Sequence, residues 1–223
     1  MQKLLLAFVS LVVLVGCNST GTTKMVSSFD DCVAQTGEVM ESYPRQCRDN
    51  DGKTWVEEIS EPVSLNGNGI AYHPDKPDLT GYVAMPEGDG PFPALILIHE
   101  WWGLNDNIRA FADQFAEQGY IALAVDLYDG EVTDTRDRAM ELVTAVRGDT
   151  EPAFENLRHA VSYLQSRDDV IADSLASVGW CFGGGWAYQM AKNDLGVEAS
   201  IMYYGQFEPE ADFMHMRSSI LGH

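Results

Sequence analysis

Hydrophobic positions change their spacing near Pro62, and two patterns alternate from there to the end of the chain. Short continuous apolar runs are typical of strands that are buried on both faces. Stretches with apolar residues at three- and four-residue intervals predict helices between them. Strands are predicted at residues 81–86, 94–98, 120–125, 176–179 and 199–203. This alternation predicts an α/β fold of the doubly wound kind, with a mostly parallel sheet between two helical layers.

Capping residues define the predicted helices. Asn105 offers an N-cap to a helix that Gly119 ends. Thr150 offers an N-cap to another helix, which carries Pro152 in its first turn. Two further helices are predicted at residues 135–146 and 182–192.

The first 16 residues resemble an export signal. Lys3 precedes an apolar run at residues 4–15, which as a helix would span about 18 Å. A bilayer core is about 30 Å thick, so the run predicts a signal peptide and not a membrane span. The string LVGC resembles a lipoprotein signal, in which Cys17 is lipidated and becomes the mature N-terminus. An ordinary secretory signal that contains a cysteine is the alternative.

The export signal and the composition limit where the protein acts and what it binds. We expect the chain to be held by lipid at the periplasmic face of a bacterial membrane, the outer membrane by preference, with residues 17–27 as a linker. The net charge of −20 argues against nucleic acid and against electrostatic attachment to anionic lipid. Hydrophobic residues make up 45% of the chain, which is typical of a protein that forms a core.

Residues 28–60 form a segment rich in turn signals and too short for a sizeable core. With its string VMESYPRQC, the segment resembles a small cysteine-paired module near the N-terminus of many exported bacterial proteins. The resemblance implies a disulfide between Cys32 and Cys47. We interpret the segment as a disulfide-stapled spacer without chemistry of its own.

Several motifs with known chemistry are excluded. HEWWG at residues 99–103 lacks the second histidine of a zincin, and the chain has no phosphate-binding loop. Residues 179–185 do not spell a dinucleotide fingerprint, because Cys181 stands in the place of the second glycine. The five histidines show no metal-ligand spacing. The sequence therefore predicts neither a metal nor a cofactor.

Cys181 occupies the centre of a Gly-x-Cys-x-Gly string between a predicted strand and a predicted helix. This pattern is typical of a nucleophile elbow, whose strained turn exposes the reactive side chain. The helix N-terminus favours a thiolate, and the amide of Phe182 is a candidate oxyanion donor. A buried structural cysteine beside a glycine-rich turn is the alternative.

Residues 61–223 resemble the dienelactone hydrolases, which are α/β-hydrolases with a cysteine nucleophile. GWCFGG is similar to the family's elbow, and IHEWWG is similar to its Glu-x-aromatic-Gly segment. The strings DLYDG and MYYG also have counterparts there. The resemblance implies hydrolysis of a small carboxylic ester or lactone through a thioester acyl-enzyme.

The family's roles carry over to five residues. Cys181 would be the nucleophile, and Glu100 would help to generate its thiolate; an exposed turn residue is the alternative for Glu100. Trp101 would supply the second oxyanion amide beside that of Phe182. Arg138 is similar in place to an arginine that binds the substrate's carboxylate, although the neighbouring Arg136 competes for that role.

The resemblance also implies a catalytic aspartate and a catalytic histidine beyond the strand predicted in SSILGH, which His223 ends. Neither has a position in this sequence, so we expect the chain to be a fragment of a hydrolase. A non-catalytic, lipid-anchored binding protein on a degenerate hydrolase scaffold is the alternative.

Overall fold

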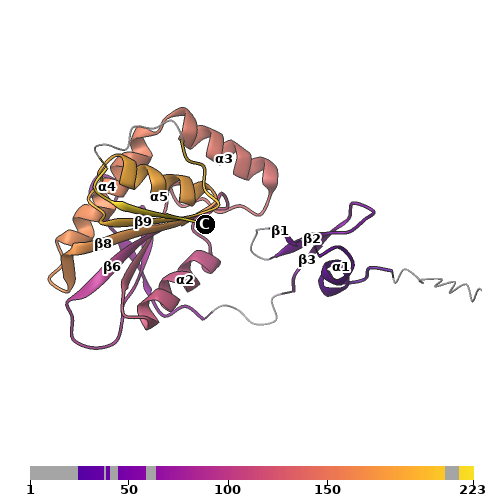
Figure 1. The fold of residues 1–223 in the computed structure, drawn as a ribbon, viewed down its shortest axis with the longest axis horizontal. Helices are drawn as coiled ribbons and strands as arrows, with labels where there is room; N and C mark the ends of the chain where they lie inside the picture. Colours follow the sequence, from indigo (N-terminus) through magenta and orange to yellow (C-terminus); the bar gives the residue numbers. More distant parts are fainter. Residues whose placement is uncertain (1–24, 38, 41–44, 59–63, 209–215) are drawn as a thin grey trace, which may run out of the picture. The chain divides into compact units, whose positions relative to one another are not determined.

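The computed structural model describes residues 25–37, 39–40, 45–58, 64–208 and 216–223 (Figure 1). The chain divides into two compact units, Met1–Ser60 and Glu61–His223. The predicted signal peptide, the lipid attachment at Cys17 and His215 lie outside the described residues. No helix in the described part of the chain combines the length and the apolarity that a membrane span requires.

The smaller unit contains one helix and a three-stranded antiparallel sheet of order β1-β2-β3. Its elements are α1 (Phe29–Thr36), β1 (Val39–Met40), β2 (Gln46–Arg48) and β3 (Thr54–Val56). The predicted disulfide is confirmed: it joins Cys32 on α1 to Cys47 on β2. Both half-cystines are fully buried with Phe29, and this small cluster is the unit's apolar core.

The larger unit is built on a seven-stranded sheet of order β10-β9-β8-β6-β7-β5-β4. The five strands from β10 to β7 are parallel, β5 runs antiparallel to β7, and the edge strand β4 runs antiparallel to β5. The strands are β4 (Asn68–Ala71), β5 (Thr80–Ala84), β6 (Phe92–Ile98), β7 (Ile121–Val125), β8 (Val170–Trp180), β9 (Ala199–Tyr203) and β10 (Ser219–Gly222). The predicted α/β fold with a mostly parallel sheet is therefore confirmed.

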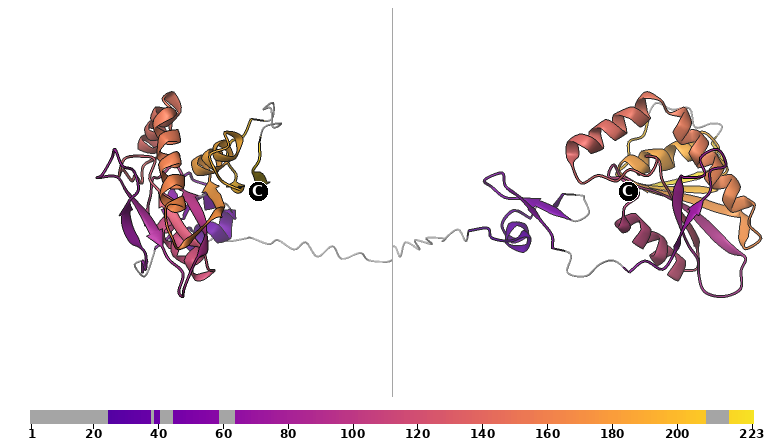
Figure 2. Two further views of the ribbon diagram at one scale, coloured as in Figure 1. Left: turned by 90° about the vertical axis from the view of Figure 1, so that its left-hand side faces the viewer. Right: turned by 180° about the vertical axis from the view of Figure 1, so that it is seen from behind.

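Helices cover both faces of this sheet (Figure 2). They are α2 (Asp106–Glu117), α3 (Arg136–Gly148), α4 (Glu151–Gln165) and α5 (Phe182–Lys192). Alternate residues of β6 point to opposite faces, so Leu95 and Leu97 pack with α2, while Ile96 and Ile98 pack in the cluster that includes α3, α4 and α5. The continuous apolar run of β6 thus has one face for each helical layer.

Most predicted element boundaries agree with the structure to within two residues. Asn105 caps α2 by accepting a hydrogen bond from the Ile108 amide at 3.2 Å. Thr150 precedes α4 but makes no side-chain capping bond, because its own backbone is already helical. The sequence prediction missed β4, an edge strand whose residues are mainly exposed.

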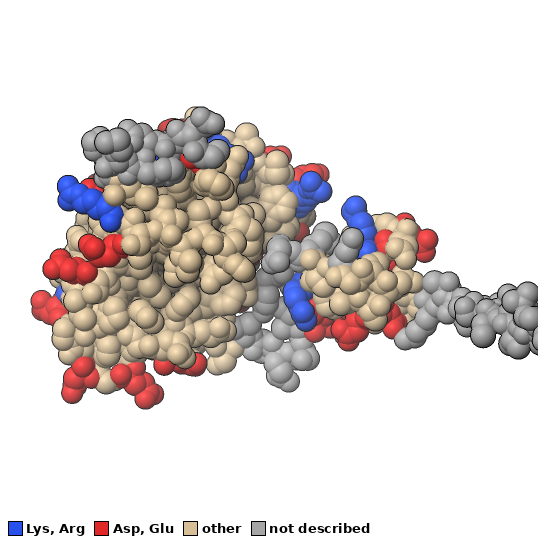
Figure 3. All heavy atoms as spheres, in the orientation of Figure 1, with Lys and Arg blue, Asp and Glu red and all other residues tan. Residues whose placement is uncertain are grey.

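Charge is distributed unevenly over the surface of the larger unit. On the face drawn in Figure 3, acidic side chains gather toward the edge and much of the middle is uncharged. The described residues of that face therefore present no broad basic surface of the kind that binds nucleic acid.

Candidate active site

Cys181 lies at the sharp turn between β8 and α5. Its backbone has φ 54° and ψ −114°, a combination that is costly for a residue with a side chain. The Cys181 amide donates to the carbonyl oxygen of Tyr203 at 3.0 Å, which fixes the turn against the end of β9. The chain therefore holds this cysteine in the strained geometry that the Gly-x-Cys-x-Gly pattern predicts.

The two glycines of the pattern let α5 approach the sheet. A Cβ atom at Gly179 would lie 2.0 Å from the carbonyl oxygen of Gly183. A Cβ atom at Gly183 would lie 2.2 Å from the carbonyl oxygen of Ile98, at the end of β6. Neither contact is sterically possible, so both positions require glycine for the N-terminus of α5 to reach the ends of β6 and β8.

The Cys181 sulfur receives opposing influences. Burial raises the pKa of the thiol, and the negative charge of Glu100 raises it further. The backbone amides of Phe182 and Trp101 lower the pKa, as does the positive charge of Arg147. The net pKa lies above the ordinary value, because burial is the largest influence. The amides thus favour the thiolate, as the sequence predicts, but burial raises the pKa of Cys181 by more than the amides lower it.

Glu100 follows β6 and is only 6% exposed, which argues against the alternative of an exposed turn residue. Its Oε1 atom accepts a hydrogen bond from the hydroxyl of Tyr204 at 3.1 Å. The negative charge of Glu100 raises the pKa of Cys181, so the carboxylate lies near enough to influence the sulfur electrostatically. The structure therefore brings together four of the five residues that the resemblance singles out: Cys181, Glu100, Trp101 and Phe182.

His99 fixes the turn that carries Glu100 and Trp101, a role that the sequence did not indicate. Its fully buried ring donates from Nδ1 to the carbonyl oxygen of Glu100 at 2.5 Å. Its Nε2 accepts from the amide of Leu127 at 3.1 Å. Only the neutral ring with its proton on Nδ1 satisfies both bonds, and burial lowers the pKa of His99 in keeping with that form.

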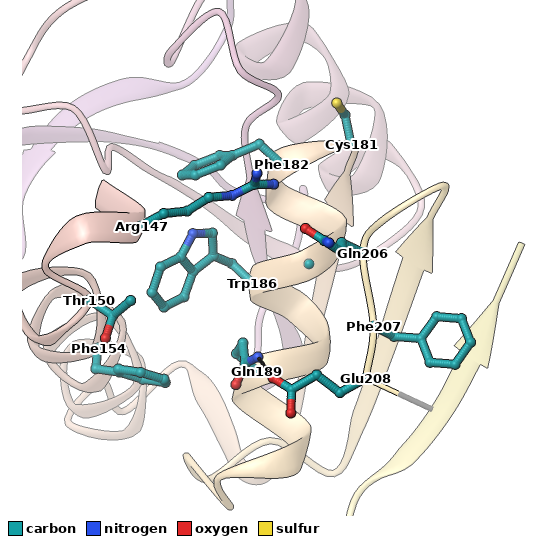
Figure 4. A pocket seen from close by; sticks show the side chains of 11 residues that line it. Arg147, Thr150, Phe154, Cys181, Phe182, Trp186, Gln189, Gln206, Phe207 and Glu208 are labelled. Carbon is teal, nitrogen blue, oxygen red and sulfur yellow. Dashed lines mark hydrogen bonds between the residues drawn. The ribbon is translucent and has the colours of Figure 1, made fainter. Parts of the chain in front are cut away.

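A pocket of about 460 Å³ opens beside Cys181 (Figure 4). Its wall is apolar where Phe154, Phe182 and Trp186 contribute, and polar where α5 faces the segment after β9. The remaining lining residues are Arg147, Thr150, Gly185, Gln189, Gln206, Phe207 and Glu208. A cavity of this size, with few polar groups beside a nucleophile, suits a small organic molecule.

Arg138 and Arg147, which both lie on α3, occupy different surroundings. Arg138 is tied to Glu131 at 2.6 Å and 2.8 Å and to Glu141 at 2.6 Å, and it is absent from the described residues that line the pocket. Arg147, in the last turn of α3, extends toward Phe182 and lines the pocket (Figure 4). The structure therefore does not bring Arg138 to Cys181, and it offers Arg147 as a cation that no motif had indicated.

Similarity to known proteins covers most of the larger unit. The model of the dienelactone hydrolase family matches residues 79–223. "Protein usf" of Aquifex pyrophilus is 32% identical over 160 residues, and a "Putative carboxymethylenebutenolidase" of Aquifex aeolicus is 31% identical over 152 residues. Each alignment covers 66% of this chain, and the chain spans 62% of the length of each relative.

A solved structure supports the same relationship. The chain superposes on the protein "m3DLH" with a TM-score of 0.61 and 27% identity, covering 71% of this chain and 67% of the other. The family match includes the strained Cys181 elbow, the Glu100 turn and most of the sheet that holds them. The chain belongs to the dienelactone hydrolase family.

Proposed function

We propose that the protein hydrolyses a small carboxylic ester or lactone with Cys181 as the nucleophile. The observation that carries this proposal is the convergence on one sulfur of the Phe182 and Trp101 amides and the Glu100 charge. Two amides that reach the sulfur also lie within reach of a carbonyl oxygen under attack there. The strained elbow keeps the side chain available to a substrate in the adjoining pocket.

The proposed reaction proceeds in two stages. Glu100 accepts the thiol proton as the Cys181 sulfur attacks the carbonyl carbon, and the two amides stabilise the resulting oxyanion. The C–O bond to the leaving alcohol then breaks, the proton passes to that oxygen, and a thioester remains on Cys181. Water attacks the thioester in the second stage, which releases the acid and regenerates the thiol.

The substrate class follows from the relatives' names and from the pocket. Several relatives carry names that denote lactone hydrolysis, which favours a lactone or activated ester for this chain. Arg147 is a cation that lines the pocket, and this arrangement favours a substrate that carries a carboxylate.

An acylation assay tests the proposal. The chain is mixed with an activated aryl ester, and the aryl alcohol released is measured together with the mass of the protein. We expect an acyl adduct on Cys181 and loss of both signals in Cys181→Ala. Ester cleavage that persists undiminished in Cys181→Ala would overturn the proposed nucleophile.

The raised pKa of Cys181 favours a second candidate, a protein that binds a small molecule in the same pocket without cleaving it. A buried neutral thiol is compatible with a binding wall and needs no general base. Tight binding of a lactone with no acyl adduct and no product would favour this candidate over the hydrolase.

We further propose attachment to a bacterial membrane through lipid on Cys17. The lipobox-like string LVGC after an apolar run supports this proposal. Labelling of cells with a radioactive fatty acid should mark the wild-type chain but not Cys17→Ser. Equal labelling of both would refute it.

A further inference from the structure

A second cluster of reactive side chains joins α4 to the loop after β4, and it shares no residue with the pocket beside Cys181. The cluster consists of His73, Glu155 and His159. We propose that these three residues bind a divalent transition-metal ion such as zinc. The ion would link the antiparallel edge of the sheet to α4.

The geometry of the cluster is close to that of a zinc site. One ligand atom from each of the three residues lies within 4.8 Å of the other two. Ligands at zinc distances of about 2.0–2.1 Å in a tetrahedron are about 3.3–3.4 Å apart. The ligand atoms therefore need to approach one another by at most about 1.5 Å. Glu155 is exposed and His159 is half-buried, so both have room to do so.

His73 points independently to a ligand. The residue is only 3% exposed, yet neither of its ring nitrogens has a hydrogen-bond partner among the described residues. Its ring lies 4.4 Å from the ring of His159, centroid to centroid. A buried imidazole without a partner is costly, and a metal bound to one nitrogen removes part of that cost.

The backbone beside the cluster is held firmly. The Tyr72 hydroxyl donates to Asn156 Oδ1 at 2.8 Å, and Asn156 Nδ2 donates to the carbonyl oxygen of Asp126 at 2.8 Å. Tyr72 and Asn156 are the chain neighbours of His73 and Glu155. These buried bonds tie the loop after β4 and α4 to each other beside the cluster, which reduces the ordering that binding requires.

The ligand types select the metal. Two imidazoles and one carboxylate are typical of zinc and its neighbours, whereas magnesium and calcium prefer oxygen ligands alone. The carboxylate of Asp75, with Oδ2 at 4.0 Å from His159 Nε2, can act as a fourth ligand or hold a bound water. Because Glu155 and His159 are one turn apart on α4 and His73 comes from the loop after β4, the ion would join two parts of the larger unit.

Calorimetry on the full chain tests the proposal, with ZnCl₂ titrated into protein that has been freed of metal by a chelator. We expect one site per chain with a Kd below about 10 μM, undiminished by millimolar Mg²⁺. Zinc at a hundredfold excess over Kd should raise the melting temperature by about 5–10 °C. His73→Gln, His159→Gln and Glu155→Gln should each weaken binding at least about tenfold.

Matched variants distinguish binding at this cluster from binding elsewhere and from a folding defect. Glu151→Gln, one turn earlier on α4, should bind zinc as the wild type does. Cys181→Ala should also bind normally, because the cluster does not involve the thiol. Glu155 is exposed, so loss of binding in Glu155→Gln at an unchanged melting temperature of the metal-free protein is not a folding defect. Binding that is lost in Cys181→Ala, that survives Glu155→Gln, or that is absent from the wild type would overturn the proposal.

Discussion

The Tyr204 hydroxyl donates a hydrogen bond to Glu100 Oε1 at 3.1 Å, and this bond joins the segment after β9 to the turn after β6. Tyr204 itself has a backbone φ of 40°, an uncommon value for a bulky residue. The bond connects two segments that both flank Cys181, since the Cys181 amide also binds the carbonyl oxygen of Tyr203. The orientation of the proposed base therefore depends on a residue far from it in the sequence.

Removal of this bond in Tyr204→Phe should slow acylation of Cys181 about 2- to 10-fold, which corresponds to the net value of one hydrogen bond. The reason is that Glu100 loses a partner that orients its carboxylate. Stopped-flow release of an aryl alcohol measures the rate. Tyr120→Phe, which alters a ring packed on Phe115, is the control. An unchanged rate in Tyr204→Phe would show that the bond does not position Glu100.

Glu100→Gln should lower the pKa of the Cys181 thiol and yet slow the acylation of Cys181. The charge of Glu100 raises the pKa of Cys181, so its removal should shift the midpoint of thiol alkylation to lower pH. In the wild type the midpoint should lie above the ordinary value of 9.0. Acylation by an ester at neutral pH should nevertheless fall at least about 10²-fold, because a general base is lost. Glu131→Gln is the matched control. A lower alkylation midpoint together with faster acylation would contradict the role of Glu100 as the base.

Arg147 and Arg138 provide a matched pair. Arg147→Gln should raise the KM for an ester with a carboxylate about 2- to 5-fold, as expected for a partly screened charge, and leave a neutral ester unaffected. It should also shift the midpoint of Cys181 alkylation to higher pH, because Arg147 lowers that pKa. Arg138→Gln should change neither property. A raised KM in Arg138→Gln and not in Arg147→Gln would instead identify Arg138 as the residue that binds the carboxylate.

Local signals in the sequence suffice for the central elements. The predicted bounds of α5 and β9 agree with the structure, because a glycine-rich turn begins the helix and an apolar run defines the strand. The edge strand β4 has no such signal, since its residues face solvent and form a strand only by pairing with β5. β8 extends back to Val170 through exposed residues that carry no buried-strand pattern.

The candidate site divides in the same way. Cys181 and Glu100 stand in short motifs whose backbone geometry is local, so the sequence identifies them. Arg147, in the last turn of α3, lines the same pocket as residues of α5 only in the folded chain, which no spacing along the sequence indicates. Glu155 and His159 were a missed signal: their i, i+4 spacing on a helix places them on one face, but His73 joins them only in the folded chain.

Steric contact at the elbow should make one glycine far more sensitive than its neighbour. In Gly183→Ala the new methyl group would lie 2.2 Å from the carbonyl oxygen of Ile98, so we expect a loss of about 3 kcal/mol or more in unfolding free energy. In Gly185→Ala the nearest atom is the Gln206 carbonyl oxygen at 3.3 Å, and the loss should stay below about 1 kcal/mol. Urea unfolding compares the two. Similar losses would mean that α5 is free to shift from β6.

The disulfide should matter for the smaller unit alone. Replacement of both Cys32 and Cys47 by alanine removes a cross-link worth about 3 kcal/mol, in a unit whose core is little more than those two residues and Phe29. Hydrogen exchange followed by mass spectrometry should show lost protection in peptides from residues 25–58 and none in peptides from residues 64–208. Protection retained in the first set would mean that the sheet β1-β2-β3 is stable without the cross-link.

The His99 ring connects two turns through one hydrogen bond from each of its nitrogens. Nδ1 donates a hydrogen bond to the turn after β6 and Nε2 accepts one from the turn after β7, so neither turn is held by its own strand alone. The second turn also carries Tyr128, whose ring lies 5.3 Å from that of Phe182. A displacement of either turn is therefore transmitted through one imidazole to the other. The Trp101 amide, which we propose as an oxyanion donor, is thereby linked through His99 to the aromatic wall beside Cys181.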